Sequence, residues 1–368
     1  MWAVIAGGGT GGHAVPAIAI GRALVESGHP QDSIHFVGSA RGIERRMVPA
    51  AGFAITLLPG RGIARRLTVD NVGAVAGLVS ALVRAVFLLR RLRPSVVVTV
   101  GGYASVACAA AAALLRIPLV VAEQNAAPGL ANRMAGRFAR ACAVSFPGTP
   151  LPRAVLTGNP VRPEISAVDR SPLGRERARA ALGIPGGRAV IAVAGGSLGA
   201  RRINEAALGL ASRWAARSDI ALRHVVGERD FDWAAASAPA VPEGGLCYQQ
   251  VRFEDRMDLL LSAADLTVQR AGASTVAELA VAGVPSILVP LPGAPGDHQT
   301  LNARGLAEAG AAVMIPDGEL DAGRLAEEIA RLTDDPDRLE SMGAAAKALG
   351  RPDAAASVAA LVEEHARA

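Results

Sequence analysis

Short runs of apolar residues alternate along the chain with longer stretches in which apolar residues recur at helical spacing. Each run ends at glycines or polar residues before the next helical stretch begins. This alternation is typical of βα units whose strands form a parallel sheet. The runs predict strands at residues 2–6, 33–37, 96–100, 119–122 and 141–144, and again at 190–194, 222–226, 266–268, 286–289 and 312–315. The pattern therefore predicts an α/β fold with two similar open sheets.

A polar connection separates the two series of strands. Residues 158–163 read Gly-Asn-Pro-Val-Arg-Pro, and no strand pattern follows until after Pro185-Gly186-Gly187. The 368 residues also exceed the roughly 100–200 residues of one ordinary domain. We predict two Rossmann-like, doubly wound domains, residues 1–161 and 162–350. The carboxyl ends of their strands are expected to face a cleft, because α/β folds bind ligands at that edge.

The charge is distributed unevenly between these halves. Residues 1–162 contain 17 arginines and five acidic residues, a net charge of +12, whereas residues 163–368 have a net charge of −7. The first half is therefore a candidate for an anionic partner: a membrane surface, a nucleic acid or a phosphorylated substrate. The low aromatic content of 3% beside 51% hydrophobic residues indicates a core of Ala, Val, Leu and Ile, as parallel sheets have.

The cysteines and the first residues bear on the compartment. Cys108, Cys142 and Cys247 are dispersed and form no CxxC pair, which predicts neither disulfides nor a zinc site and favours a reducing compartment. The first residues contain no basic segment or cleavage site of a secretion signal. We therefore expect an intracellular protein.

An apolar stretch at residues 72–89 is flanked by arginines on both sides. It approaches the ~20 residues that span a bilayer, but Arg84, Gly73 and Gly77 argue against a spanning helix. Two interpretations remain open. The stretch either presents a surface to the membrane interface under basic anchors, or it is a helix buried wholly in the core.

The first predicted strand is followed by a glycine-rich turn, Gly7 to Gly12, and by His13 at the start of a helix. Such a turn can present backbone N–H groups to a phosphate. His13 is a candidate general base toward a sugar hydroxyl, or a helix-start residue without a catalytic role. The turn also matches the dinucleotide pattern GxGxxG, but the acid expected after the second strand is replaced by Gly38-Ser39, which argues against a dehydrogenase.

Three segments of the second half are candidate ligand sites. The turn at 195–200 can hold a diphosphate through its amides and the Ser197 hydroxyl. Glu278, early in a helix after residues 270–277, is either a ribose ligand or an acid that compensates the helix dipole. Residues 297–302, Asp-His-Gln-Thr-Leu-Asn, either bind sugar hydroxyls or cap a helix.

Two acidic motifs match the DxD of metal-dependent glycosyltransferases. They are Asp230-Phe231-Asp232 and Asp335-Pro336-Asp337. Both lie in polar segments without a glycine turn beside them, so we expect solvated surface. The site is therefore predicted to need no metal ion, since two helix N-termini can stabilise a leaving diphosphate.

In combination these motifs resemble the MurG family of peptidoglycan N-acetylglucosaminyltransferases. The resemblance follows the chain in order through GGGTGGHAVPAIA, GGYAS, EQNAAPGLANR, GNPVR, GGSLGA, RAGASTVAE and DHQTLNA. It implies the GT-B architecture, with a final helix near 353–365 that returns to the first domain, so that residues 351–368 belong to that domain. It also implies a peripheral protein on the cytoplasmic face of the membrane, with UDP-GlcNAc in the second domain, the undecaprenyl-linked muramoyl-peptide in the first, and no nucleic acid.

The resemblance also implies roles for individual residues. His13 would be catalytic, and with Asn125 would face the reacting sugars. The remaining residues divide between the two substrates: Arg162, Ser197, Glu278, His298 and Gln299 for the donor, and Thr10, Gly11, Gly12, Gly102 and Tyr103 for the acceptor diphosphate. Two departures from the family pattern are Leu198, where the family commonly has Gln, and the loop 293–296.

Three other functions stay open. A GT-B transferase with another lipid or small-molecule acceptor would share the UDP site. A UDP-GlcNAc 2-epimerase would need no acceptor, and a non-catalytic membrane adaptor would bind anionic vesicles but not UDP.

Overall fold

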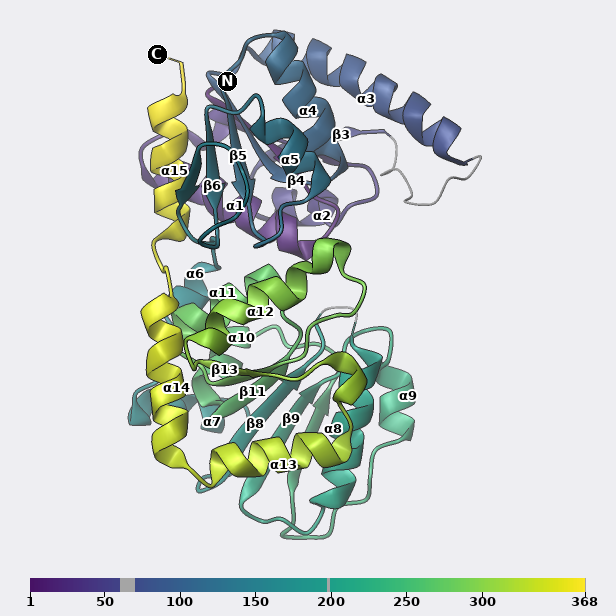
Figure 1. Cartoon of the computed structure of the whole chain (residues 1–368), viewed down its shortest axis with the longest axis vertical. Helices are drawn as coiled ribbons and strands as arrows, with labels where there is room; N and C mark the ends of the chain where they lie inside the picture. The colour runs from purple at the N-terminus through teal and green to yellow at the C-terminus, as the bar shows by residue number, and fades with distance from the viewer. Residues whose placement is uncertain (60–69, 197–198, 368) are drawn as a thin grey trace. The chain divides into compact units, whose positions relative to one another are not determined.

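The computed structural model describes residues 1–59, 70–196 and 199–367. Contacts within the chain divide it into two compact units (Figure 1). Unit 1 comprises Met1–Arg162 with Arg351–Ala368, and unit 2 comprises Pro163–Gly350. The chain therefore leaves unit 1 once and returns to it with its last segment.

Unit 1 contains a parallel sheet whose described strands follow the order β3-β2-β1-β4-β5-β6-β7. This is the doubly wound order, which reverses direction between β1 and β4. The central strands are buried on both faces, which explains why they are continuous apolar runs. The strands are β1 Ala3–Gly7, β2 Ile34–Ser39, β3 Ala54–Leu58, β4 Val96–Gly101, β5 Leu119–Glu123, β6 Ala141–Val144 and β7 Ala154–Leu156.

Helices cover both faces of this sheet. One face is covered by α1 Gly11–Glu26, α2 Glu44–Ala50 and the last helix, α15 Ala354–His365, whose Val358 and Val362 join the same buried cluster as Ile20 and Leu24 of α1. The other face is covered by α3 Asp70–Leu92, α4 Tyr103–Leu114 and α5 Leu130–Gly136. The return of α15 onto α1 is visible in Figure 1.

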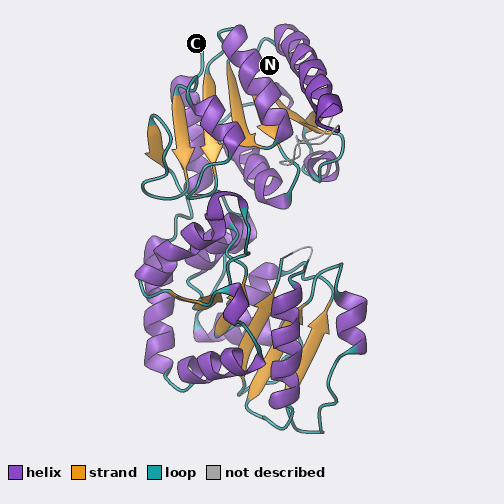
Figure 2. Cartoon of the chain, turned by 45° about the vertical axis from the view of Figure 1, so that its right-hand side comes forward, coloured by secondary structure: helices purple, strands orange, loops and turns teal. Residues whose placement is uncertain are grey.

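Unit 2 repeats the arrangement with the parallel order β10-β9-β8-β11-β12-β13 (Figure 2). Its strands are β8 Ala189–Ala194, β9 Ile220–Val225, β10 Cys247–Val251, β11 Leu266–Gln269, β12 Ser286–Leu288 and β13 Ala312–Met314. Its helices are α6 Pro163–Ser166, α7 Pro172–Ala181, α8 Arg201–Arg213, α9 Phe231–Ala236, α10 Met257–Ala263, α11 Ala273–Ala282, α12 His298–Glu308, α13 Ala322–Thr333 and α14 Pro336–Leu349. Short 3-10 turns occupy Gln31–Ser33, Pro295–Asp297 and Asp317–Glu319.

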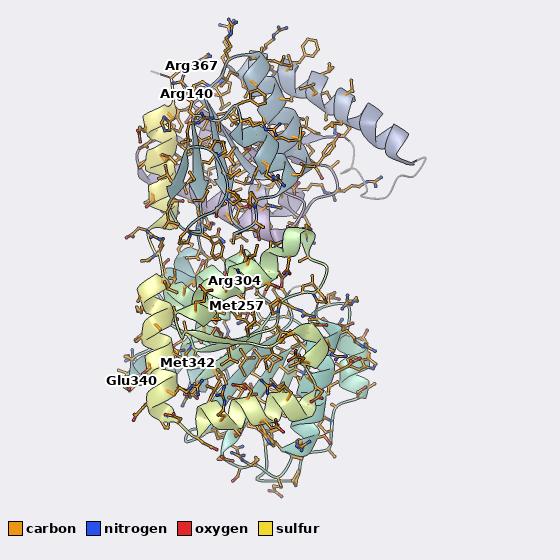
Figure 3. All side chains as sticks on the ribbon, in the orientation of Figure 1. Arg140, Met257, Arg304, Glu340, Met342 and Arg367 are labelled. Atoms are coloured by element: carbon orange, nitrogen blue, oxygen red, sulfur yellow. The ribbon has the colours of Figure 1, made fainter. Side chains whose placement is uncertain are left out.

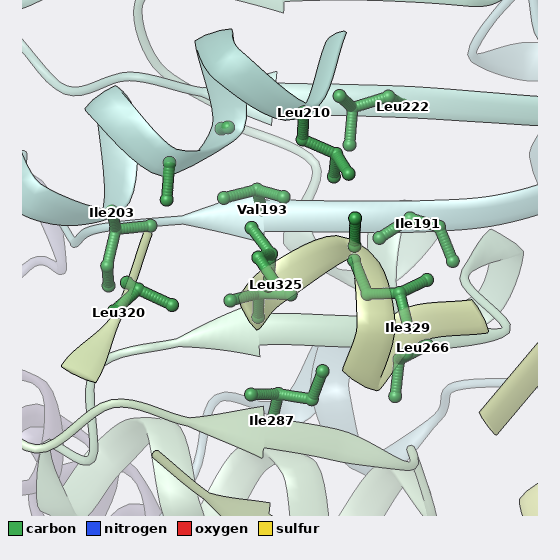
Figure 4. Close-up of a cluster of buried hydrophobic side chains, with 14 of the residues drawn as sticks. Ile191, Val193, Ile203, Leu210, Leu222, Leu266, Ile287, Leu320, Leu325 and Ile329 are labelled. Carbon is green, nitrogen blue, oxygen red and sulfur yellow. The ribbon is translucent and has the colours of Figure 1, made fainter. Parts of the chain in front are cut away.

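The main core of unit 2 lies between β8 and the helices α8 and α13 (Figure 4). Ile191 and Val193 of β8 pack against Ile203 and Leu210 of α8 and against Ile329 of α13. Each such side chain contributes about 1.5–3 kcal/mol when it leaves water. This core holds the strand ends that carry the site in fixed positions.

The α/β fold with two parallel sheets is confirmed, and a strand lies at each of the ten predicted places. Three further strands, β3, β7 and β10, were not predicted. The cysteines are free, and burial raises the pKa of the Cys108 thiol to about 12. Across the described parts of the chain, no helix is long and apolar enough to cross a bilayer.

Helix α3 decides between the two interpretations of the apolar stretch. Ala81, Ala85 and Leu89 are buried against the sheet, whereas Val79 and Phe87 are exposed, Phe87 to 67%. A helix buried wholly in the core is therefore excluded. The helix packs along one face and presents a second apolar face outward.

Candidate functional site

The first part of the site lies where β1 and β4 end side by side. Strand pairing sets Gly7 opposite Gly101, and Gly8 donates its N–H to the Gly101 carbonyl at 3.2 Å. Gly102 has a φ of 88°, and a Cβ there would lie 2.4 Å from the Gly8 carbonyl oxygen. Only glycine permits this approach of two backbones. The two predicted glycine turns therefore form one surface.

His13 lies over this surface. It is the third residue of α1, and its Nδ1 is 3.4 Å from the Thr10 hydroxyl. A Cβ on Gly101 would lie 2.9 Å from His13 Nε2, so the ring packs directly on the β4 turn. The half-buried imidazole thus stands at the carboxyl edge of the sheet, where a general base would be placed.

The N-terminus of α1 offers donors for an anion. Thr10 is the N-cap residue but its side chain makes no capping bond, and the first amides of a helix have no acceptor inside the helix. The amides of Gly11 and Gly12 are in this position, beside the positive end of the helix dipole.

The neighbouring amide of Gly9 is used within the protein. It donates to Glu44 Oε2 at 2.7 Å, and Ser39 N–H donates to Glu44 Oε1 at 2.8 Å. Glu44 is buried and ties the glycine turn to the end of β2. Glu44 was not predicted as a site residue from the sequence. The available signal was that it is one of only five acidic residues in residues 1–162.

Asn125 is positioned by a second buried acid, Glu123 at the end of β5. Glu123 Oε1 accepts from the Asn125 backbone N–H at 2.9 Å and from its side-chain amide at 3.3 Å. Glu123 Oε2 accepts from Gly129 N–H at 3.0 Å and from Asn132 Nδ2 at 2.9 Å. Because β5 adjoins β4, Asn125 lies at the same edge of the sheet as His13.

Tyr103, predicted at the acceptor diphosphate, bonds other segments of unit 1 through its hydroxyl. Its hydroxyl lies 2.8 Å from the Gly77 carbonyl oxygen and 3.0 Å from that of Pro59, toward which it donates. Burial raises the pKa of this phenol. The hydroxyl therefore ties α3 and the end of β3 to α4, while the backbone of Gly102 stays in the turn surface.

Unit 2 has its own group of candidate residues, where β8, β11 and β12 are adjacent. The turn after β8 contains Gly195, Gly196 and Gly199; Ser197 and Leu198 lie outside the described residues. Glu278 lies in the second turn of α11, half-buried. Arg162 is the last residue before unit 2 begins.

Arg270, which was not predicted as a site residue either, holds the loop after β12. Its Nη1 donates to the carbonyls of Val289 and Pro290 at 3.1 and 3.2 Å and pairs with Asp317 Oδ1 at 2.6 Å. The loop that leads to α12 is thereby fixed to the end of β11.

His298 and Gln299 begin α12. Gln299 Oε1 accepts a hydrogen bond from the Leu291 N–H at 2.9 Å. His298 Nδ1 lies 2.9 Å from the Pro295 carbonyl oxygen, and because a carbonyl oxygen only accepts, Nδ1 is the donor of this bond. Before them Asp297 adopts the left-handed conformation with a φ of 51°. Both side chains thus stabilise the loop that precedes α12, each through one of its polar atoms.

The prediction of solvated surface for Asp230 is wrong. Asp230 is 5% exposed, is bonded by Arg229 Nη2 at 2.9 Å and by Asn204 Nδ2 at 3.1 Å, and the Arg229 guanidinium lowers its pKa. A Cβ on Gly199 would lie 3.3 Å from its Oδ2, so Asp230 packs under the glycine turn. Asp232, Asp335 and Asp337 are exposed, as predicted.

No group of metal-ligating side chains occurs among the described residues. The Asp230 carboxylate accepts hydrogen bonds from Arg229 and Asn204, and Asp232 forms an ion pair with Arg252 at 2.7 Å. Among the described residues, both carboxylates of this DxD therefore bind protein side chains.

Matches to two protein-family domains show which class of protein this chain belongs to. Residues 3–144 match the glycosyltransferase family 28 N-terminal domain, and residues 190–358 match the family 28 C-terminal domain. The fold and these matches define a glycosyltransferase with two Rossmann-like domains.

Full-length relatives narrow this class. Proteins of Desulforudis audaxviator (41% identity; 99% of this chain, 98% of the relative) and Alkalilimnicola ehrlichii (42% identity; 100% and 99%) are both named UDP-N-acetylglucosamine–N-acetylmuramyl-(pentapeptide) pyrophosphoryl-undecaprenol N-acetylglucosamine transferase. The crystal structure of Acinetobacter baumannii MurG matches with a TM-score of 0.78 at 28% identity, over 98% of this chain and 99% of that one. The chain belongs to the MurG family. A UDP-GlcNAc 2-epimerase of Neisseria meningitidis, at 11% identity and a TM-score of 0.68 over 99% of this chain and all of that one, shares the fold alone.

Proposed function

We propose that this chain transfers N-acetylglucosamine from UDP-GlcNAc to the C4 hydroxyl of undecaprenyl-diphospho-muramoyl-pentapeptide, with inversion at the anomeric carbon. The observation that carries the proposal is the position of His13, packed on the Gly101 turn beside the open N-terminus of α1. A base and an anion site at one strand edge match an acceptor that carries a hydroxyl and a diphosphate.

In unit 1 the acceptor is held and activated. The amides of Gly11 and Gly12 bind the acceptor diphosphate, with Thr10 and the backbone of Gly102 beside them. The imidazole of His13 removes the proton from the C4 hydroxyl as this oxygen bonds to the anomeric carbon of GlcNAc. A positioned base supplies about 10²–10⁴ in rate, and Asn125 contributes by orienting the sugars.

In unit 2 the donor is held. Glu278 accepts from the ribose hydroxyls, and Gln299 and His298 contact the GlcNAc hydroxyls. The bond from the anomeric carbon to the UDP oxygen breaks, and UDP leaves with the electron pair. Arg162, the Ser197 hydroxyl and the N-terminus of α8 stabilise the charge on the diphosphate, so that no metal ion is required.

Unit 1 also provides a surface for the membrane that carries the acceptor. Exposed apolar residues recur at spacings of four along α3 and from α5 to the residues just after it, and α3 and α5 both contact α4 (Figure 1). We define the apolar stripe by these residues: Val79, Val83, Phe87, Leu130, Met134 and Phe138. Exposed arginines occur on the same segments: Arg84 and Arg90 on α3, Arg133 on α5, and Arg137 and Arg140 just after it; Figure 3 labels Arg140. Apolar side chains under basic anchors favour peripheral binding to an anionic surface, here the cytoplasmic face of the cell membrane.

The test is transfer of radiolabelled GlcNAc to a short-chain muramoyl-pentapeptide diphosphoryl lipid, with EDTA present. Labelled disaccharide lipid is expected only when the acceptor is added. Tight UDP binding without this product contradicts the proposed acceptor, and turnover of UDP-GlcNAc without acceptor identifies an epimerase instead. Loss of product on adding EDTA contradicts the metal-free donor site.

A further inference from the structure

A cavity of about 980 Å³ lies in unit 2 at the edge of the sheet opposite the candidate site. Gly187, Asp265 and Pro285 line it, and each comes shortly before a strand, namely β8, β11 and β12. The turns of the candidate site follow the carboxyl ends of the same strands. The cavity is therefore separate from the site described above.

Two helices form its walls. Arg175 and Arg179 of α7 are four residues apart, and Leu339, Gly343 and Lys347 of α14 follow at the same spacing. This spacing places each set on one face of its helix. Glu340, also on α14, marks this wall in Figure 3.

The charges in the cavity are unequal. The guanidinium groups of Arg170, Arg175 and Arg179 line it together with one half-buried carboxylate, that of Asp265. Arg175 pairs with this carboxylate, and Arg179 Nη2 lies 2.7 Å from its Oδ2, which also accepts from Val190 N–H at 2.6 Å.

Arg170 has a different kind of partner. Its Nη1 donates to the backbone carbonyls of Leu261 and Ala264, the latter at 2.8 Å, and no described carboxylate lies within ion-pair distance of it. Glu176 and Glu340 also line the cavity, but both are exposed and neither forms an ion pair with the other described residues. The half-buried part of the lining, three guanidinium groups and the Asp265 carboxylate, therefore has two more positive than negative charges. The exposed Lys347, Glu176 and Glu340 bring the net charge of the whole lining to +1.

Crowding of these cations affects their acidity. Burial, with the charges of Arg175 and Arg179, lowers the pKa of Arg170 to about 9, and burial also lowers the pKa of Arg175 and of Arg179. Like charges held together out of water raise the free energy of the charged cluster. An anion in the cavity would remove this cost, and the planar guanidinium fork matches the oxygens of a phosphate.

We propose that this cavity binds a soluble organic diphosphate, with its phosphates on Arg170, Arg175 and Arg179. The two excess positive charges of the half-buried part of the lining match a diphosphate group. The volume, well above that of phosphate alone, falls within the ~300–1,000 Å³ of small-molecule sites. Ile184, Pro285 and Leu339 provide apolar wall for the organic part. The proposal is independent of the transferase reaction, since it concerns the other edge of the sheet.

The test uses full-length protein saturated with UDP, titrated calorimetrically with ADP and with inorganic diphosphate. The variant Ala344→Glu places a carboxylate in the cavity from an exposed helical position, and Ala348→Glu, exposed on the same helix but outside the cavity, is the matched control. Wild type and Ala348→Glu are expected to bind ADP with a Kd of about 1 mM or tighter, and Ala344→Glu at least about 10-fold more weakly. UDP affinity should be equal in all three.

Arg170→Gln is the second variant, since its amide can still donate to the carbonyls of Leu261 and Ala264. It too should weaken ADP binding about 10-fold. Absence of ADP and diphosphate binding beside UDP, or equal ADP affinity in the two glutamate variants, overturns the proposal. Binding to phosphatidylglycerol vesicles tests whether the phosphate that binds in the cavity belongs to a lipid headgroup or to a soluble molecule. If Ala344→Glu abolishes vesicle binding while ADP never binds, the soluble ligand is overturned.

Discussion

Glu123 and Asn125 form a two-point contact in which one carboxylate oxygen accepts from the backbone N–H at 2.9 Å and from the side-chain amide at 3.3 Å. The other oxygen holds Gly129 and Asn132. One buried carboxylate therefore sets both the path of the loop after β5 and the direction of Asn125. We therefore expect Glu123 to affect activity by holding Asn125 and this loop in position, without contacting the substrate itself.

Replacement Glu123→Gln should lower kcat by about 10-fold, since hydrogen bonds to a charged acceptor contribute about 1.5–3 kcal/mol and the amide cannot accept at both oxygens. The KM for UDP-GlcNAc should change little, and Glu123→Asp should recover less than half of the loss because its carboxylate is withdrawn. Steady-state transfer with each variant measures this. Unchanged kcat in folded Glu123→Gln protein would show that the loop does not need this contact.

Replacement His13→Ala removes the proposed base. The expected loss in kcat is about 10²–10⁴, with the Kd for UDP-GlcNAc unchanged because the ring lies in unit 1 over the Gly101 turn. His29→Gln is the control, a histidine of the same unit that pairs with Glu363 of α15. Single-turnover transfer and equilibrium UDP-GlcNAc binding separate the two effects. Equal activity of His13→Ala and wild type refutes the assignment.

The strands that the sequence predicted and those it did not differ in burial. Val97, Val98 and Val120 in central strands are buried on both faces, so the central strands are unbroken apolar runs. The missed strands β3, β7 and β10 lie at sheet edges. β10 reads Cys-Tyr-Gln-Gln-Val and is half-exposed throughout, because an edge strand has a neighbour on one side only. Such a segment does not differ in pattern from a polar loop.

The glycine turns could be predicted because they directly follow strands, and parallel strands end at one edge. The buried acids could not. Glu44, Glu123 and Asp230 each bind amides or cations from other segments of the chain, and these become neighbours only after folding. Around Asp230 the sequence is polar, so local pattern indicated solvent exposure, whereas the Asn204 and Arg229 contacts bury it.

The two acids of residues 230–232 provide a matched pair of substitutions. Asp230→Asn removes the charge that binds Arg229 under the Gly199 turn and should weaken UDP binding about 5- to 10-fold, a cost of roughly 1–1.4 kcal/mol. Asp232→Asn, on an exposed side chain, should leave UDP binding within twofold. Fluorescence titration with UDP, with and without Mg²⁺, measures both. Equal, Mg²⁺-dependent losses in the two variants would instead indicate a metal-binding DxD.

The buried His224 predicts a pH dependence of stability. Its Nδ1 lies 3.0 Å from the Tyr248 hydroxyl and its Nε2 3.0 Å from Asn204 Oδ1, and burial lowers its pKa to about 4. The unfolded chain binds this proton near pH 6.5, so between about pH 6.5 and 4 the unfolded state holds more protons and stability falls as pH falls.

Between pH values well above 6.5 and well below 4, this difference in the pKa of His224 lowers the free energy of unfolding by about 3 kcal/mol, at 1.36 kcal/mol for each pKa unit. His224→Gln should remove this part of the slope, so that wild type loses more stability than the variant between pH 7 and 4.5. Urea unfolding at several pH values gives the difference. Parallel pH profiles for the two proteins would mean that His224 does not carry this dependence.

The apolar stripe predicts a separation between vesicle binding and chemistry. Phe87→Glu places a charge among exposed apolar residues of α3 without touching Ala81, Ala85 or Leu89, which pack inward. Since an inserted Phe contributes about 1.5–3 kcal/mol, binding to phosphatidylglycerol vesicles should weaken about 10- to 100-fold. Leu173→Glu, at an exposed apolar residue of α7 in unit 2, is the control and should bind as wild type does.

With a water-soluble short-chain acceptor both variants should transfer GlcNAc at the wild-type rate, because neither residue lies at the strand edges that hold the substrates. With the long-chain acceptor in vesicles only Phe87→Glu should be slow. Raising the salt concentration should weaken the remaining vesicle binding of Phe87→Glu further, since arginines alone then hold the surface and their attraction is screened. Vesicle binding by Phe87→Glu that equals that of Leu173→Glu would place the membrane contact elsewhere on the protein.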